Sequence, residues 1–211
     1  TILSISIPSR HTNIINIGCD LKSSQDSIDI ANNHAFAYAA VGIHPHSASE
    51  AKDGYLDELK KMAAVQKVVA IGEIGLDYHY DFSPREVQLK VFEEQLILAS
   101  ELNLPVVIHS REATEDTLRL LKQYKPKGVV HCFSGSVEMA KEIVNLGMYI
   151  GIGGVVTFKN AAKLVKVVDE IPLDKIVLET DAPYMAPEPV RGTVNRSDYI
   201  HYIAERIAQI K

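Results

Sequence analysis

Three features are scarce in this 211-residue chain: long apolar runs, cysteines and an excess of basic residues. No apolar segment approaches the ~20 residues of a membrane-spanning helix, and no signal-peptide pattern opens the sequence, so we expect no membrane association. Cys19 and Cys132 are too few for a disulfide scaffold, and their apolar neighbours predict two buried thiols in a reduced, cytoplasmic protein. The net charge of −5 argues against binding nucleic acid through a broad basic surface.

Short apolar segments alternate with amphipathic segments along the whole chain. Seven segments read as buried strands: NIINIG, AFAYAAVG, KVVAIG, PVVIH, GVVHC, MYIGIG and KIVLET. Helical spacing fills the gaps, over about 24–32, 56–65, 84–103, 113–124, 137–146, 161–169 and 197–210. Strict strand–helix alternation predicts an α/β fold with a parallel sheet, and nothing divides residues 1–211 into more than one domain. At the start of the predicted helix over 84–103, Ser83, Pro84 and Glu86 form the pattern of a capping box, with Ser83 as N-cap.

Residues of metal-binding type follow four of these strands. KVVAIG ends in Glu73, PVVI in His109, GVV in His131 and KIVLET in Asp181. The carboxyl ends of parallel strands share one face, so these four side chains are predicted to converge. Ligands on so many strands favour a TIM-like (β/α)8 barrel over an open doubly wound sheet, although seven strands are one fewer than that barrel contains.

Each of these residues, taken alone, has a structural alternative. A single acid after a strand is commonly a surface residue or a turn cap, and a single histidine there is commonly a core residue. Recurrence at four strand ends favours the functional interpretation. GIHPH adds His44 and His46 after the second strand, where either could contact substrate or metal, with a loop histidine of no chemical role as the alternative for each. Arg111 and Arg191 are candidates for phosphate contact, because guanidinium matches phosphate geometry, with solvated surface arginines as the alternative.

The donor set contains nitrogen and oxygen atoms without an obvious thiolate. It suits Mg²⁺, Mn²⁺ or Zn²⁺ without choosing among them. Such a site favours hydrolysis, in which a metal lowers the pKa of water and a carboxylate accepts its proton. A metal-loaded acidic site also attracts phosphate locally, so the negative net charge does not exclude a nucleic-acid substrate.

Five segments resemble the signature segments of the TatD metal-dependent deoxyribonucleases. Four of them follow one another as successive signatures of that family: IGEIGLDYH, VIHSREA, HCFSG and LETDAPY. GIHPH, nearer the start of the chain, matches the family as well. The resemblance runs from about residue 11 to the end of the chain. It implies a TIM-barrel hydrolase with divalent metal ions, two in number, that cleaves DNA phosphodiesters by 3′→5′ exonuclease action. It further implies a single-stranded DNA substrate, while the oligomeric state stays open with a monomer as the expectation.

The resemblance also implies roles for individual residues. Glu73 resembles the bridging metal ligand, and His109 and His131 resemble ligands of one metal. Asp181 resembles the metal-binding acid that activates water, and His44 resembles a site histidine at the phosphate.

Two departures from the family pattern stand out. Family members open with a strand that carries a His-x-His pair, whereas TILSISIPSR enters where the family's first helix is nearly finished. We therefore expect that this sequence lacks the first strand and part of the first helix of the barrel. Near Arg191-Gly192, residues Val190, Thr193 and Val194 are less polar than the family pattern, which puts the phosphate-binding contribution of this loop in question.

Two other functions remain open from the sequence alone. One is hydrolysis of a small amide, lactone or phosphoester, since related barrels place similar ligands on the same strand ends and a fold does not fix a substrate. The other is a non-catalytic barrel that acts as an interaction protein, since a barrel without its first strand has an exposed strand edge.

Overall fold

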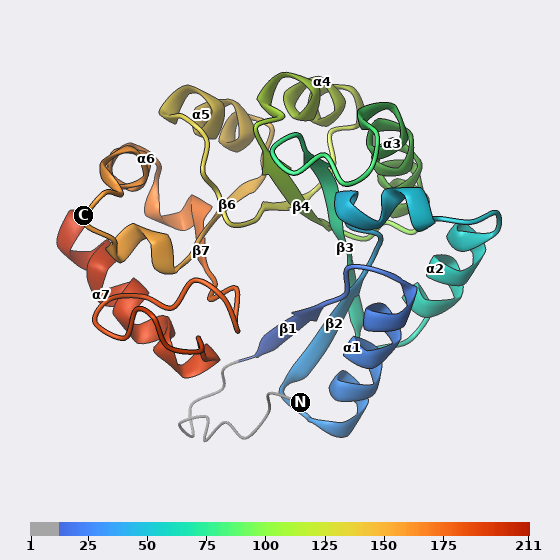
Figure 1. The fold of residues 1–211 in the computed structure, drawn as a ribbon, viewed down its shortest axis with the longest axis horizontal. Coiled ribbons are helices and arrows are strands. Elements are labelled where there is room, and N and C mark those ends of the chain that lie inside the picture. The colour runs from blue at the N-terminus through green and yellow to red at the C-terminus, as the bar shows by residue number, and fades with distance from the viewer. Residues whose placement is uncertain (1–12) are drawn as a thin grey trace. The chain divides into compact units, whose positions relative to one another are not determined.

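The computed structural model describes residues 13–211 and divides them into two compact units, residues 13–129 and residues 130–211. Residues 1–12, which contain the TILSISIPSR segment, lie outside the described residues. Strands alternate with helices in each unit (Figure 1). Across the described part of the chain, none of the helices has both the length and the apolar character that crossing a bilayer requires.

The first unit holds four parallel strands that pair in chain order. The strands are β1 (Ile14–Ile17), β2 (Ala37–Val41), β3 (Val68–Asp77) and β4 (Val106–Arg111). The helices are α1 (Leu21–Asn33), α2 (Tyr55–Ala63), α3 (Arg85–Glu101) and α4 (Thr114–Tyr124), with the 3-10 turn η1 (Pro45–Glu50) after β2. Since the strands are parallel, their carboxyl ends lie at one edge of the sheet.

The second unit continues the alternation. Strand β5 (Gly128–Val130) lies at the boundary between the units, and β6 (Tyr149–Ile152) pairs in parallel with β7 (Ile176–Leu178). The helices are α5 (Val137–Asn145), α6 (Ala162–Glu170) and α7 (Ile200–Ile210). Three 3-10 turns complete the unit: η2 (Gly154–Thr157), η3 (Leu173–Lys175) and η4 (Ser197–Tyr199).

The core of the first unit consists of its central strands and one face of α3. Ile71, Ile74 and Ile108 are fully buried, which explains the β-branched composition of strands covered on both faces. The buried face of α3 is otherwise apolar but includes two glutamines. Gln95 accepts a hydrogen bond from the backbone N–H of Ile43 (2.7 Å) and donates to its carbonyl (3.0 Å), so the helix holds the segment that follows β2.

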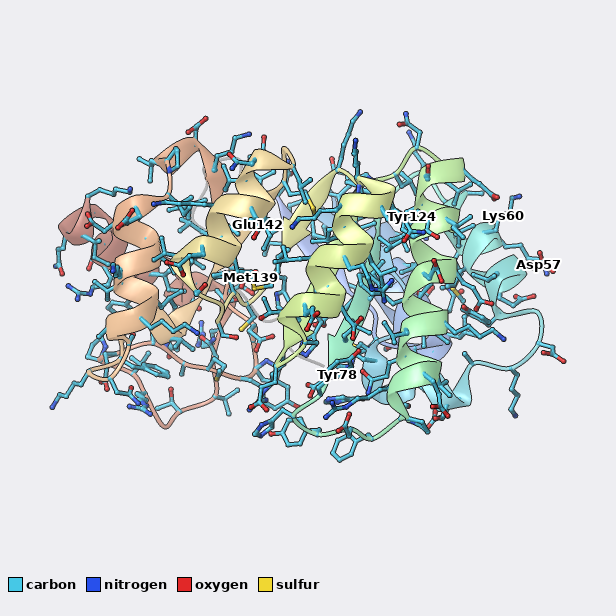
Figure 2. The ribbon with its side chains drawn as sticks, turned by 90° about the horizontal axis from the view of Figure 1, so that it is seen from above. Asp57, Lys60, Tyr78, Tyr124, Met139 and Glu142 are labelled. Atoms are coloured by element: carbon cyan, nitrogen blue, oxygen red, sulfur yellow. The ribbon has the colours of Figure 1, made fainter. Side chains whose placement is uncertain are left out.

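The second glutamine, Gln88, connects α3 to the end of β3. Its side-chain oxygen accepts from the N–H of Asp77 (2.8 Å), and its amide donates to the carbonyls of Asp77 (3.1 Å) and Ser83 (2.8 Å). Helix α4 lies beside α3, with Tyr78 and Tyr124 toward its opposite ends (Figure 2). The hydroxyl of Tyr78 donates to Asp116 (2.8 Å) in the first turn of α4, and that of Tyr124 donates to Glu93 of α3.

The predicted α/β alternation is confirmed, and the predicted capping box is wrong. All seven predicted strands and all seven predicted helices are present, with ends that differ by a few residues. Pro84 is the N-cap of α3 and makes no side-chain cap, whereas the hydroxyl of Ser83 accepts from the N–H of Ser49 (3.0 Å) and donates to the carbonyl of His46 (3.1 Å). The Ser83 hydroxyl makes hydrogen bonds to residues distant in sequence instead of capping α3 as the local pattern predicts.

A substitution at Gly75 tests the close approach of β3 to β4. Gly75 lies opposite His109 with φ of +142°, and a Cβ there would lie 1.9 Å from the carbonyl oxygen of His109. We expect Gly75→Ala to lower the free energy of unfolding by about 3 kcal/mol or more, because backbone strain adds to an overlap with main-chain atoms. Chemical denaturation measures this. Gly54→Ala is the matched control, since Gly54 also has a positive φ (+87°) but nothing within 4 Å of the added Cβ; equal losses in the two variants would contradict the argument.

Candidate metal centre

Three side chains from the first unit converge at the carboxyl edge of its sheet. His44 follows β2, Glu73 lies on β3 and His109 lies on β4, and each offers one ligand atom within 4.8 Å of the others. Glu73 Oε1 lies 3.0 Å from His109 Nδ1 and 3.5 Å from His44 Nε2. All three side chains are less than a fifth exposed. In this nearly buried setting, the Glu73 oxygen and the His109 nitrogen are donor atoms that fit a divalent cation, and the His44 ring lies beside them.

The His44 ring is held in one tautomer. Its Nδ1 accepts a hydrogen bond from the backbone N–H of His46 (3.1 Å), and its own backbone N–H donates to the carbonyl of Cys19 (2.8 Å). Burial lowers the pKa of His44, which outweighs the opposite effect of Glu73. A neutral ring that accepts at Nδ1 carries its proton on Nε2, so His44 presents an N–H to the centre.

The His109 ring lies between two carboxylates. Its Nδ1 is 3.0 Å from Glu73 Oε1, and its Nε2 is 3.0 Å from Asp77 Oδ2. Burial by itself would lower the pKa of His109, but the hydrogen bonds to Asp77 and Glu73 outweigh burial and raise it. Asp77 thereby fixes the ring through Nε2 and leaves Nδ1 directed at Glu73, which is the arrangement of a carboxylate that orients a metal-binding histidine.

Asp77 is a residue of the candidate site that sequence reasoning missed in this unit. Only 1% of its surface is exposed, and its Oδ2 also lies 3.0 Å from Nε2 of His46. Burial alone would raise the pKa of this carboxyl, but the hydrogen bonds from His109, from the N–H of Tyr80 and from His46 outweigh burial and hold the pKa well below its usual range. The signal was available in IGEIGLDYH, where a second carboxylate ends the strand four residues after Glu73.

Cys19 also differs from its prediction. It is exposed rather than buried, and its Sγ lies 3.8 Å from Glu73 Oε2. The buried-thiol prediction is therefore wrong for Cys19, because this residue follows β1 at the carboxyl edge instead of lying within the strand. The second predicted buried thiol, Cys132, is only partly buried.

His131 and Asp181 belong to the second unit, and the cluster of His44, Glu73 and His109 includes neither of them. Nδ1 of His131 lies 3.0 Å from Glu179 Oε2, while the other oxygen of Glu179 accepts from the N–H of Cys132. This pairing fixes the ring and identifies Nε2 as the atom that would meet a metal. Glu179, two residues before Asp181, is a second orienting carboxylate that sequence reasoning missed.

Two features of the second unit hold these acids in place. Gly151 provides room for Glu179, because a Cβ at Gly151 would lie 2.4 Å from Glu179 Oε2. The segment around Asp181 is fixed by the fully buried Asn195, whose amide donates to the carbonyls of Thr180 and Tyr184 (2.6 Å each). Asp181 itself has φ of +57°, so its backbone is bent into a left-handed conformation as it leaves the strand.

The two candidate arginines are each engaged with an aromatic ring. Arg111 ends β4, and its guanidinium carbon lies 4.8 Å from the ring centroid of Tyr80. In the second unit, the Arg191 guanidinium lies 4.0 Å from the Phe158 ring centroid and 3.9 Å from the carboxylate of Glu188. Arg111 therefore lies at the same strand edge as His109, whereas Arg191 already has a carboxylate partner.

A family model described as TatD related DNase matches residues 6–211. The chain belongs to the TatD family. It is 44% identical over 201 residues to YabD of Bacillus subtilis, named an uncharacterized metal-dependent hydrolase, and the match covers 94% of this chain and 79% of YabD. It is 37% identical over 200 residues to a protein of Escherichia fergusonii named 3′-5′ ssDNA/RNA exonuclease TatD, covering 91% of this chain and 77% of that protein.

A solved structure gives the same assignment. The crystal structure of YJJV, a TatD homologue from Escherichia coli K12, matches with a TM-score of 0.89 at 35% identity, over 94% of this chain and 78% of that one. The predicted family and the predicted fold class, a TIM-like α/β barrel with seven strands in the described residues, are confirmed. The prediction of an enzyme is confirmed at the level of the TatD family, whose members here are named metal-dependent hydrolases and a nuclease.

Metal binding at His109 should depend on pH through Asp77. A metal needs the neutral ring at Nδ1, so affinity weakens as the pH falls through the His109 pKa, which is raised above the ordinary 6.5. In Asp77→Asn we expect this midpoint to move to lower pH, because the ring loses a charged acceptor, and we expect the affinity at high pH to fall about 10- to 100-fold with the loss of orientation. Calorimetric titration with Mn²⁺ or Zn²⁺ at a series of pH values measures both.

The matched control is Asp81→Asn, which removes the same charge from an exposed position where Asp81 pairs with Arg85. It should leave both the midpoint and the affinity unchanged. Thermal unfolding reports whether either variant has lost its fold. A folded Asp77→Asn protein with the original midpoint would show that Asp77 does not set the protonation of His109.

Proposed function

We propose that the chain is a divalent-metal-dependent hydrolase that cleaves phosphodiester bonds of single-stranded DNA by 3′→5′ exonuclease action. The observation that carries the proposal is the Glu73 oxygen shared by His109 and His44 in a member of the TatD family. The name of the Escherichia fergusonii relative, a 3′-5′ ssDNA/RNA exonuclease, supports the direction of cleavage and the single-stranded substrate. The cytoplasmic location stays a prediction.

We assign Glu73 and His109 as metal ligands on their mutual geometry. From the sequence pattern we add His131 and Asp181, which gives a set large enough for two cations of Mg²⁺, Mn²⁺ or Zn²⁺ type. When bound, such a cation lowers the pKa of water and polarises the phosphodiester. Asp181 then accepts the proton of the attacking water, a role that suits a carboxylate at a metal centre.

His44 has a different role from the ligands. Its Nδ1 is occupied by the N–H of His46 and its Nε2 carries the proton, so the ring is a hydrogen-bond donor. A donor 3.5 Å from Glu73 Oε1 is suited to a phosphate oxygen held at the centre. Arg111, at the same strand edge, is the second candidate for phosphate contact, while Arg191 is a weaker one because Glu188 lies against it.

Replacing Asp181 tests the proposed reaction. We expect Asp181→Asn to lower the rate of shortening of a 5′-labelled single-stranded oligonucleotide by about 100-fold or more, because general base catalysis contributes that much. The assay uses Mg²⁺ or Mn²⁺, and addition of a chelator should abolish cleavage. Asp174→Asn, an exposed acid in the same unit, should cleave like the unchanged chain. Full activity in a folded Asp181→Asn protein would refute the assigned role, and hydrolysis of small esters without cleavage of DNA would refute the proposed substrate.

Substitutions of His44 and of Glu73 should have different effects on metal affinity. We expect His44→Ala to reduce kcat by roughly 100-fold through loss of a donor, with metal affinity within a factor of about two. Glu73→Gln should instead weaken metal binding by at least about 10-fold, since it removes the shared carboxylate. Calorimetric metal titration beside the oligonucleotide assay distinguishes the two. Equal losses of metal affinity in both variants would make His44 a ligand instead of a phosphate donor.

A further inference from the structure

Two aromatic side chains stand exposed beside the candidate metal centre. Tyr80 and Phe82 lie in the loop between β3 and α3 and are 48% and 67% exposed. Their rings stack, with centroids 5.2 Å apart and planes 20° from parallel. Apolar rings of this size are ordinarily buried, so a stacked exposed pair next to a site needs an explanation.

The exposure of these rings does not come from a loosely held loop. At its start, Oδ1 of Asp77 accepts hydrogen bonds from the N–H groups of His79 (3.0 Å) and Tyr80 (2.9 Å). At its end, the fully buried Ser83 bonds to Ser49 and His46, and its carbonyl accepts from Gln88. Both ends are anchored by buried polar groups, and the rings between them are held toward solvent in a fixed arrangement.

The ring pair is continuous with the metal centre. The His46 ring meets both rings edge-on, with centroids 5.4 Å from Tyr80 and 4.8 Å from Phe82. His46 in turn shares the Oδ2 atom of Asp77 with His109. The aromatic pair is therefore one side chain removed from the network that orients a candidate metal ligand.

A positive charge completes this surface. The Arg111 guanidinium lies 4.8 Å from the Tyr80 ring centroid, on the strand that carries His109 two residues earlier. Exposed aromatic faces combined with a cation form the type of surface that binds unpaired nucleobases and their phosphates, because every base has a face that can stack.

We propose that Tyr80 and Phe82 form a stacking platform for an unpaired nucleobase adjacent to the phosphodiester that is cleaved. This inference rests on the proposed function and deepens it. Arg111 contacts a phosphate that flanks the stacked base. A base within a duplex has both faces covered by its neighbours, so the platform accepts a single strand and rejects a paired one. On this account, the preference for single strands comes from the β3–α3 loop and not from the metal ligands.

Binding to two matched oligonucleotides tests the platform. Fluorescence anisotropy measures the affinity of the full chain for a labelled single strand and for the same strand with abasic residues at its 3′ end, in an Asp181→Asn background with Mn²⁺ so that binding is read without cleavage. We expect Phe82→Ala to weaken binding of the base-bearing strand roughly 5- to 150-fold, the range measured for loss of one base–aromatic stack. It should leave binding of the abasic strand unchanged, and Phe82→Tyr should retain the affinity of Phe82.

Tyr149→Ala is the matched control. Tyr149 is 39% exposed and has Lys175 5.0 Å from its ring centroid, but it begins β6 instead of following the end of a strand. It should bind both strands like the unchanged chain. The platform is refuted if Phe82→Ala weakens both strands equally or neither, or if its only effect is to abolish self-association seen by light scattering.

The binding assay and the cleavage assay together distinguish failure of the platform from failure of the proposed function. A chain that binds single strands through Phe82 but cuts none would refute the proposed function and support the platform. A chain that cuts DNA and keeps its affinity after Phe82→Ala would support the proposed function and refute the platform.

Discussion

The carboxylate of Asp77 is the interaction on which the first unit's site depends. One oxygen accepts from His46 and His109, and the other accepts from two backbone N–H groups of the following loop. A buried charge is tolerated only when hydrogen bonds replace its hydration, and here four donors do so. The same group therefore orients a candidate metal ligand and fixes the loop that exposes Tyr80 and Phe82.

The second unit repeats the arrangement with Glu179. One oxygen holds His131 and the other accepts from the N–H of Cys132. In both units a histidine at a strand end is oriented by a carboxylate that lies behind it. Since one ring nitrogen is engaged by the carboxylate, each pairing fixes which nitrogen a metal would meet.

The sequence predicted the strands and helices more accurately than it predicted the hydrogen-bond partners of individual side chains. Strands buried on both faces must be apolar, so β3 and β4 were recognisable, and the acids and histidines that end them were conspicuous. Of the four residues predicted to converge, Glu73 and His109 lie together, beside His44. Asp77 and Glu179 were missed because an acid at a strand end looks the same in sequence whether it faces water or a ring nitrogen.

Ser83 shows the limit of local patterns most directly. Its spacing to Glu86 matches a capping box, but its hydroxyl bonds instead to Ser49 and His46, far away in the chain. The prediction that Cys19 is buried failed for a related reason, since the edge of a sheet is not visible in composition. In both cases the decisive partner belongs to another element.

The chain-order pairing of β1 to β4 has a consequence for synthesis. Each strand pairs with the one before it across a single intervening helix, so the contacts that build this edge span short stretches of chain. Every strand pairing that builds this edge is complete once residue 111 has been translated. Domains fold as they emerge from the ribosome, so His44, Glu73, Asp77 and His109 can reach their mutual arrangement while Asp181 is still being translated.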